Sequence, residues 1–183
     1  MTLKDEISHV LPQHHLRLVL VQPDIPQNAG NIARLCAVTG AELHLVKPLG
    51  FFLTEKHFRR SGMDYLHKIS LKVHESLDEL FDDMAGNFWL CSSRGKESLW
   101  QTRFSSDDWL LFGSETTGLP SPLLQTHQER TVRIPMGPAQ RCLNVSTAAG
   151  IVVYEALRQI AGGRLGEPAL LNRMGINEGK SDE

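Results

Sequence analysis

Residues 131–160, TVRIPMGPAQRCLNVSTAAGIVVYEALRQI, decide which fold the rest of the chain can adopt. The apolar run 131–134, closed by Pro135, predicts a strand, and 144–160 predicts the longest helix of the chain, starting at Asn144. This helix is apolar on most sides, so it must be buried on most sides. In so small a domain a sheet covers only one face of it. We expect the other face to contact a second copy in a homodimer, with burial inside one chain as the alternative.

Upstream of this unit, short apolar runs alternate with helical patterns. Strands are expected at 16–21, 43–46, 69–73, 88–91 and 109–112. Helices are expected from a cap at Asn28 to a stop at Gly40, over 54–60, from the capping box 76–79 to about Gly86, and from Ser121 with Pro122 at its first position. This alternation predicts an α/β fold: a parallel sheet with helices on both faces.

The bulk composition indicates one globular domain in a reducing cytoplasm. The chain has 183 residues and a net charge of −2, which disfavours a protein that coats nucleic acid by charge alone. The three cysteines are far apart, without CxxC spacing, and no apolar run approaches the roughly 20 residues of a membrane span. The eight histidines form no HxxxH pair, so no metal is expected. We divide the chain into an extension at 1–15, a domain at 16–161 and a polar tail at 162–183.

Three loops of unusual composition follow predicted strands. They are PDIPQNAGNIAR at 23–34, GSETTGLP at 113–120 and IPMGPAQRCLNVS at 134–146. Ligands of open α/β sheets gather at the carboxyl ends of the strands, so these loops are the candidate site. Gly113 and Gly118 have the spacing of a phosphate-binding Walker loop, but Leu119-Pro120 replaces its lysine and hydroxyl, which argues against ATP or GTP hydrolysis. No strand-to-helix junction carries a dinucleotide fingerprint.

In order and spacing, the segments PDIPQNAGNIARLC, LLFGSETTGLP and RIPMGPAQRCLNVSTAAGIVVYEA resemble the signature motifs of the SPOUT methyltransferases. The likeness covers about 16–161 and is strongest to the TrmL-type (YibK-like) tRNA 2′-O-methyltransferases. It implies a deep trefoil knot in the last part of the chain, an exception to the usual absence of threading. It also implies that knot loops hold S-adenosylmethionine (SAM) in a bent form. By motif position the SAM contacts would be Cys91, Gly113, Ile134 and Cys142, with Gly118 and Leu143.

The resemblance also implies roles at the methyl-acceptor site. Arg34 would lie at the methyl-acceptor site, where family proposals let the arginine take the proton. A guanidinium stays protonated and makes a poor base, so our hypothesis is that Arg34 binds an RNA phosphate and stabilises negative charge on the attacking oxygen, with the proton lost to water or phosphate. Asn28, Glu115 and Asn144 would order the loops or hydrogen-bond the acceptor ribose. Relatives often carry serine where this chain has Cys142, so a hydroxyl contact there is in doubt, whereas a backbone contact is not.

The expected substrate is the wobble nucleotide of a tRNA anticodon. The alternatives are ribosomal RNA, or an inactive protein that binds SAM or RNA. The basic segment 56–74, with Arg59 and Arg60, and the loop residue Arg141 are candidate RNA contacts. The competing interpretation of the basic segment is an ordinary solvated surface.

Overall fold

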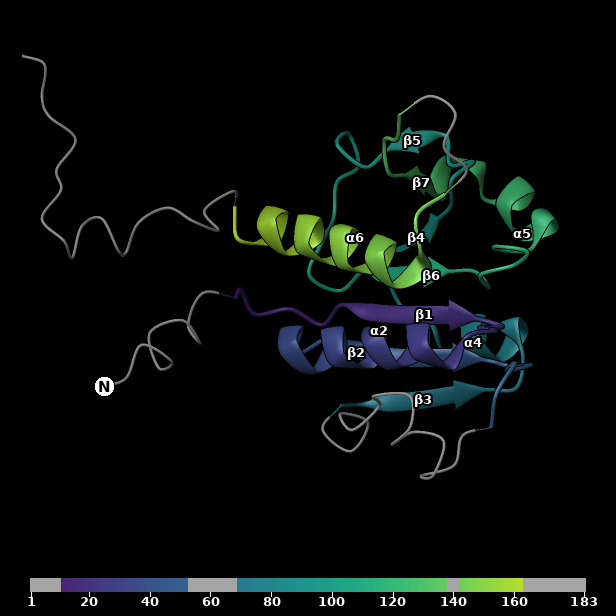
Figure 1. Ribbon diagram of the computed structural model, residues 1–183. Helices are drawn as coiled ribbons and strands as arrows, with labels where there is room; N and C mark the ends of the chain where they lie inside the picture. The colour runs from purple at the N-terminus through teal and green to yellow at the C-terminus, as the bar shows by residue number, and fades with distance from the viewer. Residues whose placement is uncertain (1–10, 53–68, 138–141, 163–183) are drawn as a thin grey trace, which may run out of the picture.

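A single parallel sheet forms the centre of the computed structural model, which describes residues 11–52, 69–137 and 142–162 (Figure 1). Its strands are β1 (Arg17–Val21), β2 (Glu42–Val46), β3 (Leu71–His74), β4 (Phe88–Cys91), β5 (Glu97–Ser98), β6 (Trp109–Phe112) and β7 (Thr131–Arg133). Their order across the sheet is β3-β2-β1-β6-β4-β7-β5, and every paired neighbour is parallel. The parallel α/β sheet predicted from the sequence is confirmed.

Helices cover both faces of this sheet, as predicted. Helices α2 (Pro26–Thr39) and α6 (Val145–Ile160) pack side by side on one face, and α4 (Leu77–Asp83) and α5 (Ser121–Thr126) cover the other. Alternate residues of the central strands enter the two cores: Leu18 and Leu20 of β1 face α2 and α6, whereas Val19 and Val21 face α4 and α5. Because both faces are buried, the central strands need continuous apolar runs.

Of the predicted helix-end residues Gly40, Asn144 and Asn28, the first two agree with the prediction from the sequence. Gly40 ends α2 in the left-handed conformation with φ of 84°, and Asn144 caps α6 by accepting from the N–H groups of Ser146 and Thr147. The prediction of Asn28 as the cap of α2 is wrong. That helix begins at Pro26, whose fixed φ and missing N–H suit a first turn, and Ile25 occupies the cap position without a side-chain bond.

Smaller differences arise where local sequence is weakly informative. Ser76 caps α4 by accepting from the N–H of Glu79, as predicted, but the helix ends at Asp83 rather than near Gly86. The sequence does not predict β5 or the 3-10 turn η2 (Gln128–Arg130). The predicted helix at 54–60 lies outside the described residues. No helix in the described ranges is long and apolar enough to cross a membrane.

Two histidines form a buried pair on the α4 side of the sheet. His44 of β2 and His74 of β3 are 1% and 2% exposed, and their Nδ1 and Nε2 atoms lie 2.9 Å apart. The His44 ring also packs on Trp109, with ring centroids 4.7 Å apart. The pKa of His44 is lowered from 6.5 to about 4, mainly by burial and then by His74 and Lys72, while Glu42, 3.5 Å from Nε2, raises it in part.

This pair predicts an acid-sensitive fold. Between pH 4 and 6.5 His44 is protonated in the unfolded chain and neutral in the folded chain. The free energy of unfolding therefore rises with pH across that window and falls on acidification. The shift corresponds to about 3 kcal/mol at about 1.36 kcal/mol per pKa unit. Urea denaturation at half-unit pH steps measures this loss. A His44→Phe variant should show a shallower slope between pH 5 and 6.5, and an equal slope in both proteins would contradict the assignment.

Candidate functional site

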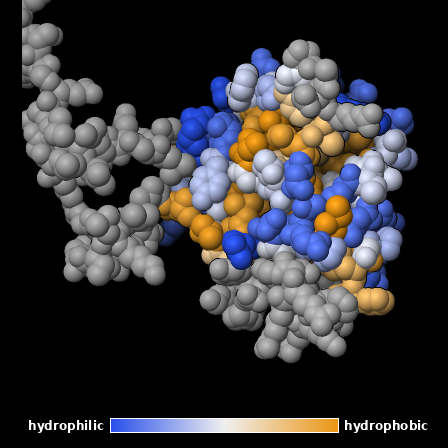
Figure 2. Space-filling view, viewed as in Figure 1, coloured by the Kyte–Doolittle hydropathy of each residue, from blue (hydrophilic) through white to orange (hydrophobic). Residues whose placement is uncertain are grey.

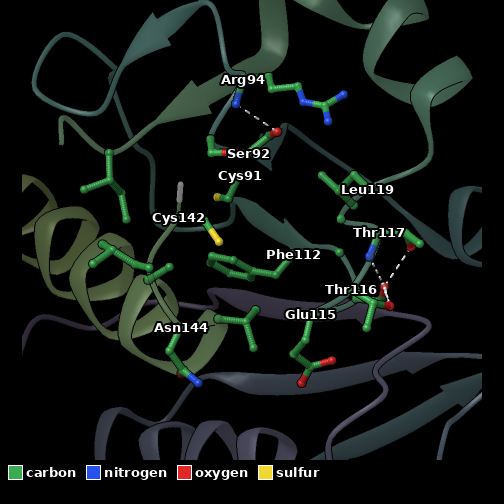
Figure 3. A pocket seen from close by; sticks show the side chains of 18 of the residues that line it. Cys91, Ser92, Arg94, Phe112, Glu115, Thr116, Thr117, Leu119, Cys142 and Asn144 are labelled. Atoms are coloured by element: carbon green, nitrogen blue, oxygen red, sulfur yellow. Dashed lines mark hydrogen bonds between the residues drawn. The ribbon is translucent and has the colours of Figure 1, made fainter. Parts of the chain in front are cut away.

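A cavity of about 550 Å³ opens where the central strands end. The segments after β1, β4, β6 and β7 and the start of α6 all contribute to its lining, so it lies at the carboxyl edge of the sheet. Every residue predicted to contact SAM is among the lining residues: Cys91, Gly113, Gly118, Ile134, Cys142 and Leu143. Asn28, Glu115 and Asn144 line it too, and Figure 3 shows Glu115 and Asn144 along one side. The three loops singled out from the sequence thus meet at one place.

Hydrogen bonds join the three loops to one another. The Glu115 carboxylate accepts from the backbone N–H of Asp24 and from Nδ2 of Asn28, both at 2.8 Å. Oδ1 of Asn28 in turn accepts from Nδ2 of Asn144 at 2.9 Å. Thr116 adds a bond from its hydroxyl to the Asp24 carboxylate at 2.5 Å. The loop after β6 is therefore tied to α2 and to the start of α6.

This network has a fixed direction. Oδ1 of Asn144 accepts from the N–H groups at the start of α6, so its Nδ2 must face Asn28. Asn28 must then present its oxygen to Asn144 and its Nδ2 to residue 115. Turning either amide over would place two donors against each other. The side chain at position 115 therefore needs two hydrogen-bond acceptor atoms, which the two oxygens of a carboxylate provide.

We predict that Glu115→Gln weakens the site although it preserves size. One end of the glutamine would place an NH₂ group against the N–H of Asp24 or against Nδ2 of Asn28, leaving a donor unsatisfied. The expected loss is about 1–3 kcal/mol of stability, with weaker SAM binding. Thermal unfolding and calorimetry measure both. The control is Glu129→Gln, which changes an exposed carboxylate paired with Lys96. Equal losses of stability and SAM affinity in the two variants would contradict the hydrogen-bond directions assigned to this network.

Glycine allows the loop after β6 to fold tightly on itself. A Cβ atom at position 113 would overlap the carbonyl carbon of Gly118 and the nitrogen of Leu119. Gly118 has φ of 73°, a conformation that side chains disfavour, and forms a bridge to Ser114. The residues of this loop line the cavity, while the N–H groups of Thr117 and Gly118 are bonded within the loop to the hydroxyl and the carbonyl of Ser114.

The match of a family model decides the assignment of the chain. The model described as SpoU rRNA Methylase family matches residues 15–154. The chain belongs to the SpoU rRNA methylase family. This span contains every strand and all three loops.

Relatives within the SpoU family are similar over most of their length. The chain is 46% identical over 147 residues to the tRNA (cytidine(34)-2′-O)-methyltransferase of Burkholderia cenocepacia, covering 78% of this chain and 94% of that protein. The Polaromonas enzyme of the same name is 42% identical over 146 residues, covering 78% and 89%.

Solved structures agree with this assignment. One described as giving insight into the 2-OH methylation of C/U34 on tRNA has a TM-score of 0.78 and 42% identity, covering 82% of this chain and 99% of that one. The SpoU methyltransferase AviRb from Streptomyces viridochromogenes, in complex with AdoMet, has a TM-score of 0.71 and 27% identity, covering 84% and 61%.

The side chain of Arg34 is not part of the cavity wall of this SpoU domain. It is exposed on α2, on the same outer stripe as Val38, and is not among the residues that line the cavity of its own chain. The other predicted RNA contacts, Arg59, Arg60 and Arg141, lie outside the described residues.

Two thiols of the cavity differ in exposure. Burial raises the pKa of the Cys91 thiol far above its usual range, so it stays protonated and serves as an apolar wall. Cys142 is exposed in the third loop, two residues before the Asn144 cap of α6. Within the described part of the chain no cluster of histidine, cysteine, aspartate and glutamate has the makings of a metal site.

Sequence reasoning missed several residues of this SpoU site. Asp24 anchors both Glu115 and Thr116, and Arg94 lines the cavity from the loop after β4. Asp24 lies in the first loop, 23–34, so a polar residue next to a strand end was an available signal. For Arg94 the sequence offers no such signal, because one arginine after a strand looks like an ordinary surface residue.

Proposed function

We propose that the chain transfers a methyl group from SAM to the ribose 2′-hydroxyl of a tRNA nucleotide, the cytidine or uridine at the wobble position of the anticodon. The observation that carries the proposal is the hydrogen-bonded meeting of three SpoU motif loops around one cavity. The names of the relatives support the substrate. A tRNA substrate favours the cytoplasm as the place of the reaction.

The cavity fits SAM in size and chemistry. A volume of about 550 Å³ falls within the range of small-molecule sites, roughly 300–1,000 Å³. Phe112, Leu119 and Ile134 give it an apolar wall suited to a planar adenine, and the glycine loop gives backbone donors and acceptors. Gly113 leaves no room for a side chain against the backbone of Gly118 and Leu119, so the loop stays folded tightly at the edge of the cavity. SAM would supply an activated methyl group on a sulfonium.

The residues of this chain must then position and stabilise the attacking hydroxyl. Forming a full alkoxide from a ribose hydroxyl at neutral pH costs roughly 7 kcal/mol, because its pKa lies about five units higher. Arg34 lowers this cost by facing the oxygen as charge develops and by gripping a neighbouring phosphate in a bidentate contact. Asn28, Glu115 and Asn144 keep the loops in the geometry for in-line attack.

The active form in this proposal is a homodimer built on α2 and α6. Both helices lie on one sheet face, and their outer stripes expose Val38 at 59%, Tyr154 at 48% and Ile151 at 39%. Figure 2 shows this face, with apolar residues among polar ones. Covering these side chains with a second copy would also bring Arg34 to the interface. That supports a role for Arg34 at the partner's cavity, since it does not line its own.

We also infer the trefoil knot of the SPOUT fold for the segment after β6. In support, β7 pairs between β4 and β5, strands that precede it in the chain. The tight loop 113–118 lies beside the start of α6 at the same cavity. A late segment that passes between two earlier ones, as β7 does between β4 and β5, is consistent with threading.

Methyl transfer to purified RNA tests the proposal. The wild-type protein is incubated with tritiated-methyl SAM and either total tRNA or ribosomal RNA, and the labelled nucleotide is mapped by mass spectrometry. The expected product is a 2′-O-methylated cytidine or uridine at the wobble position. Label only in ribosomal RNA, the substrate that the family name carries, would reject the tRNA proposal. SAM binding by calorimetry without transfer to either RNA would indicate an inactive binding protein.

A further inference from the structure

A second cavity of about 320 Å³ adjoins the first. Arg94, Ser121 and Leu124 line both, so these side chains stand between two neighbouring spaces. Lys96, Gln125 and Gln128 line the far part, which gives it cationic and amide groups. The second space leads away from the glycine loop that borders the first. It suits a polar chain that continues past the main cavity.

Arg94 stands on a turn with a fixed backbone. The N–H of Gly95 donates to the carbonyl of Ser92 at 3.0 Å, and the N–H of Lys96 donates to the Thr131 hydroxyl at 2.8 Å. A Cβ atom on Gly95 would collide with the backbone of Val132, so the turn lies directly against β7. The exposed Arg94 side chain therefore starts from a rigid base. In Figure 3 it lies across the cavity from Glu115 and Asn144.

The charge balance at this turn leaves Arg94 available for an anion. Lys96 pairs with Glu129, their Nζ and Oε1 atoms 2.5 Å apart. Within the described ranges no carboxylate lies in salt-bridge contact with the Arg94 guanidinium. A guanidinium presents a planar fork of donors that matches phosphate oxygens.

We propose that Arg94 binds a backbone phosphate of the tRNA next to the methylated nucleotide, with Gln125 and Gln128 donating to the same strand. This inference rests on the proposed function. An RNA strand continues beyond the acceptor ribose, which accounts for a polar space beside the main cavity.

Arg94→Ala tests the proposal through tRNA affinity and its salt dependence. The variant should bind total tRNA about tenfold more weakly, and the slope of log Kd against log salt should fall by about 1, because one phosphate contact is lost. Its Kd for SAM should match wild type. Arg103 lies in the segment that leads into β6, at the amino ends of the strands, whereas the cavity lies at their carboxyl ends. Arg103→Ala therefore removes an equal charge away from the cavity and should keep the wild-type slope.

The outcomes separate this site from the function on which it rests. Wild type that methylates no tRNA overturns the proposed function and the phosphate site with it. Wild type that methylates tRNA, with an Arg94→Ala variant of unchanged affinity and slope, overturns the phosphate site alone. Weaker SAM binding with unchanged tRNA binding would assign Arg94 to the cofactor carboxylate, which also overturns it. Arg94→Lys should restore the salt slope but only part of the affinity, since the fork is lost.

Discussion

Arg34→Ala is expected to lower kcat/KM for tRNA methylation by about 10²- to 10³-fold, the usual effect of removing one group that stabilises developing charge. The side chain lies on the outer face of α2 and is absent from the cavity lining, so its loss should leave SAM binding at the wild-type Kd. Single-turnover kinetics with saturating SAM measure the chemical step, and calorimetry measures the cofactor affinity.

A lysine at this position separates charge from geometry. Arg34→Lys keeps the positive charge but loses the planar fork, so we expect most of the alanine defect to remain. Turnover of Arg34→Lys close to wild type would reject the bidentate contact in favour of a simple charge effect. The Arg103→Ala variant serves as the control for removal of an exposed arginine outside the cavity.

The sequence specifies where the site lies better than how it is held together. Short apolar runs between turn signals locate the strands 88–91 and 109–112 without error, because runs of four residues are too short for a buried helix. Parallel strands bring their carboxyl ends to one edge, so three polar loops after strands are expected along that edge. They meet at one cavity because β1, β6 and β7 lie close together in the strand order, which the sequence does not reveal.

The network and the sheet edge depend on contacts distant in the sequence. Asn28 looks like a helix cap because its type suits that role, but its partners are Glu115 and Asn144, 87 and 116 residues away. The two residues of β5 carry no periodicity, and only pairing with β7 makes them a strand. Nothing in the sequence marks His44 and His74 as a pair, and only the pairing of β2 with β3 places them together.

Gly113→Ala is expected to abolish cofactor binding at the concentrations that saturate wild type. The added Cβ would overlap the backbone of Gly118 and Leu119, atoms that cannot rotate away as a side chain would. The loop must shift, and a displacement of about 1 Å at a reacting centre can cost about 10²-fold in rate. Calorimetry with SAM and the methyl-transfer assay measure the loss. Gly150→Ala, in the middle of α6 with nothing within 4 Å of its Cβ and outside the cavity lining, is the matched control for calorimetry and should bind SAM normally. Because Gly150 lies one turn before Tyr154 on the proposed interface, this control is not used for the methyl-transfer assay.

Together the two variants test whether Arg34 serves its own cavity or that of the partner. In a mixed dimer of Arg34→Ala and Gly113→Ala subunits, one cavity is intact and the only arginine at position 34 belongs to the other chain. If Arg34 acts across the interface, mixing two inactive proteins restores activity at one site per mixed dimer. If it acts within its own chain, every site lacks either the cavity or the arginine, and the mixture stays inactive. Tandem-affinity purification of differently tagged subunits isolates the mixed dimer, and circular dichroism verifies that each variant is folded. Failure to recover any mixed dimer at high protein concentration would count against the proposed interface on α2 and α6.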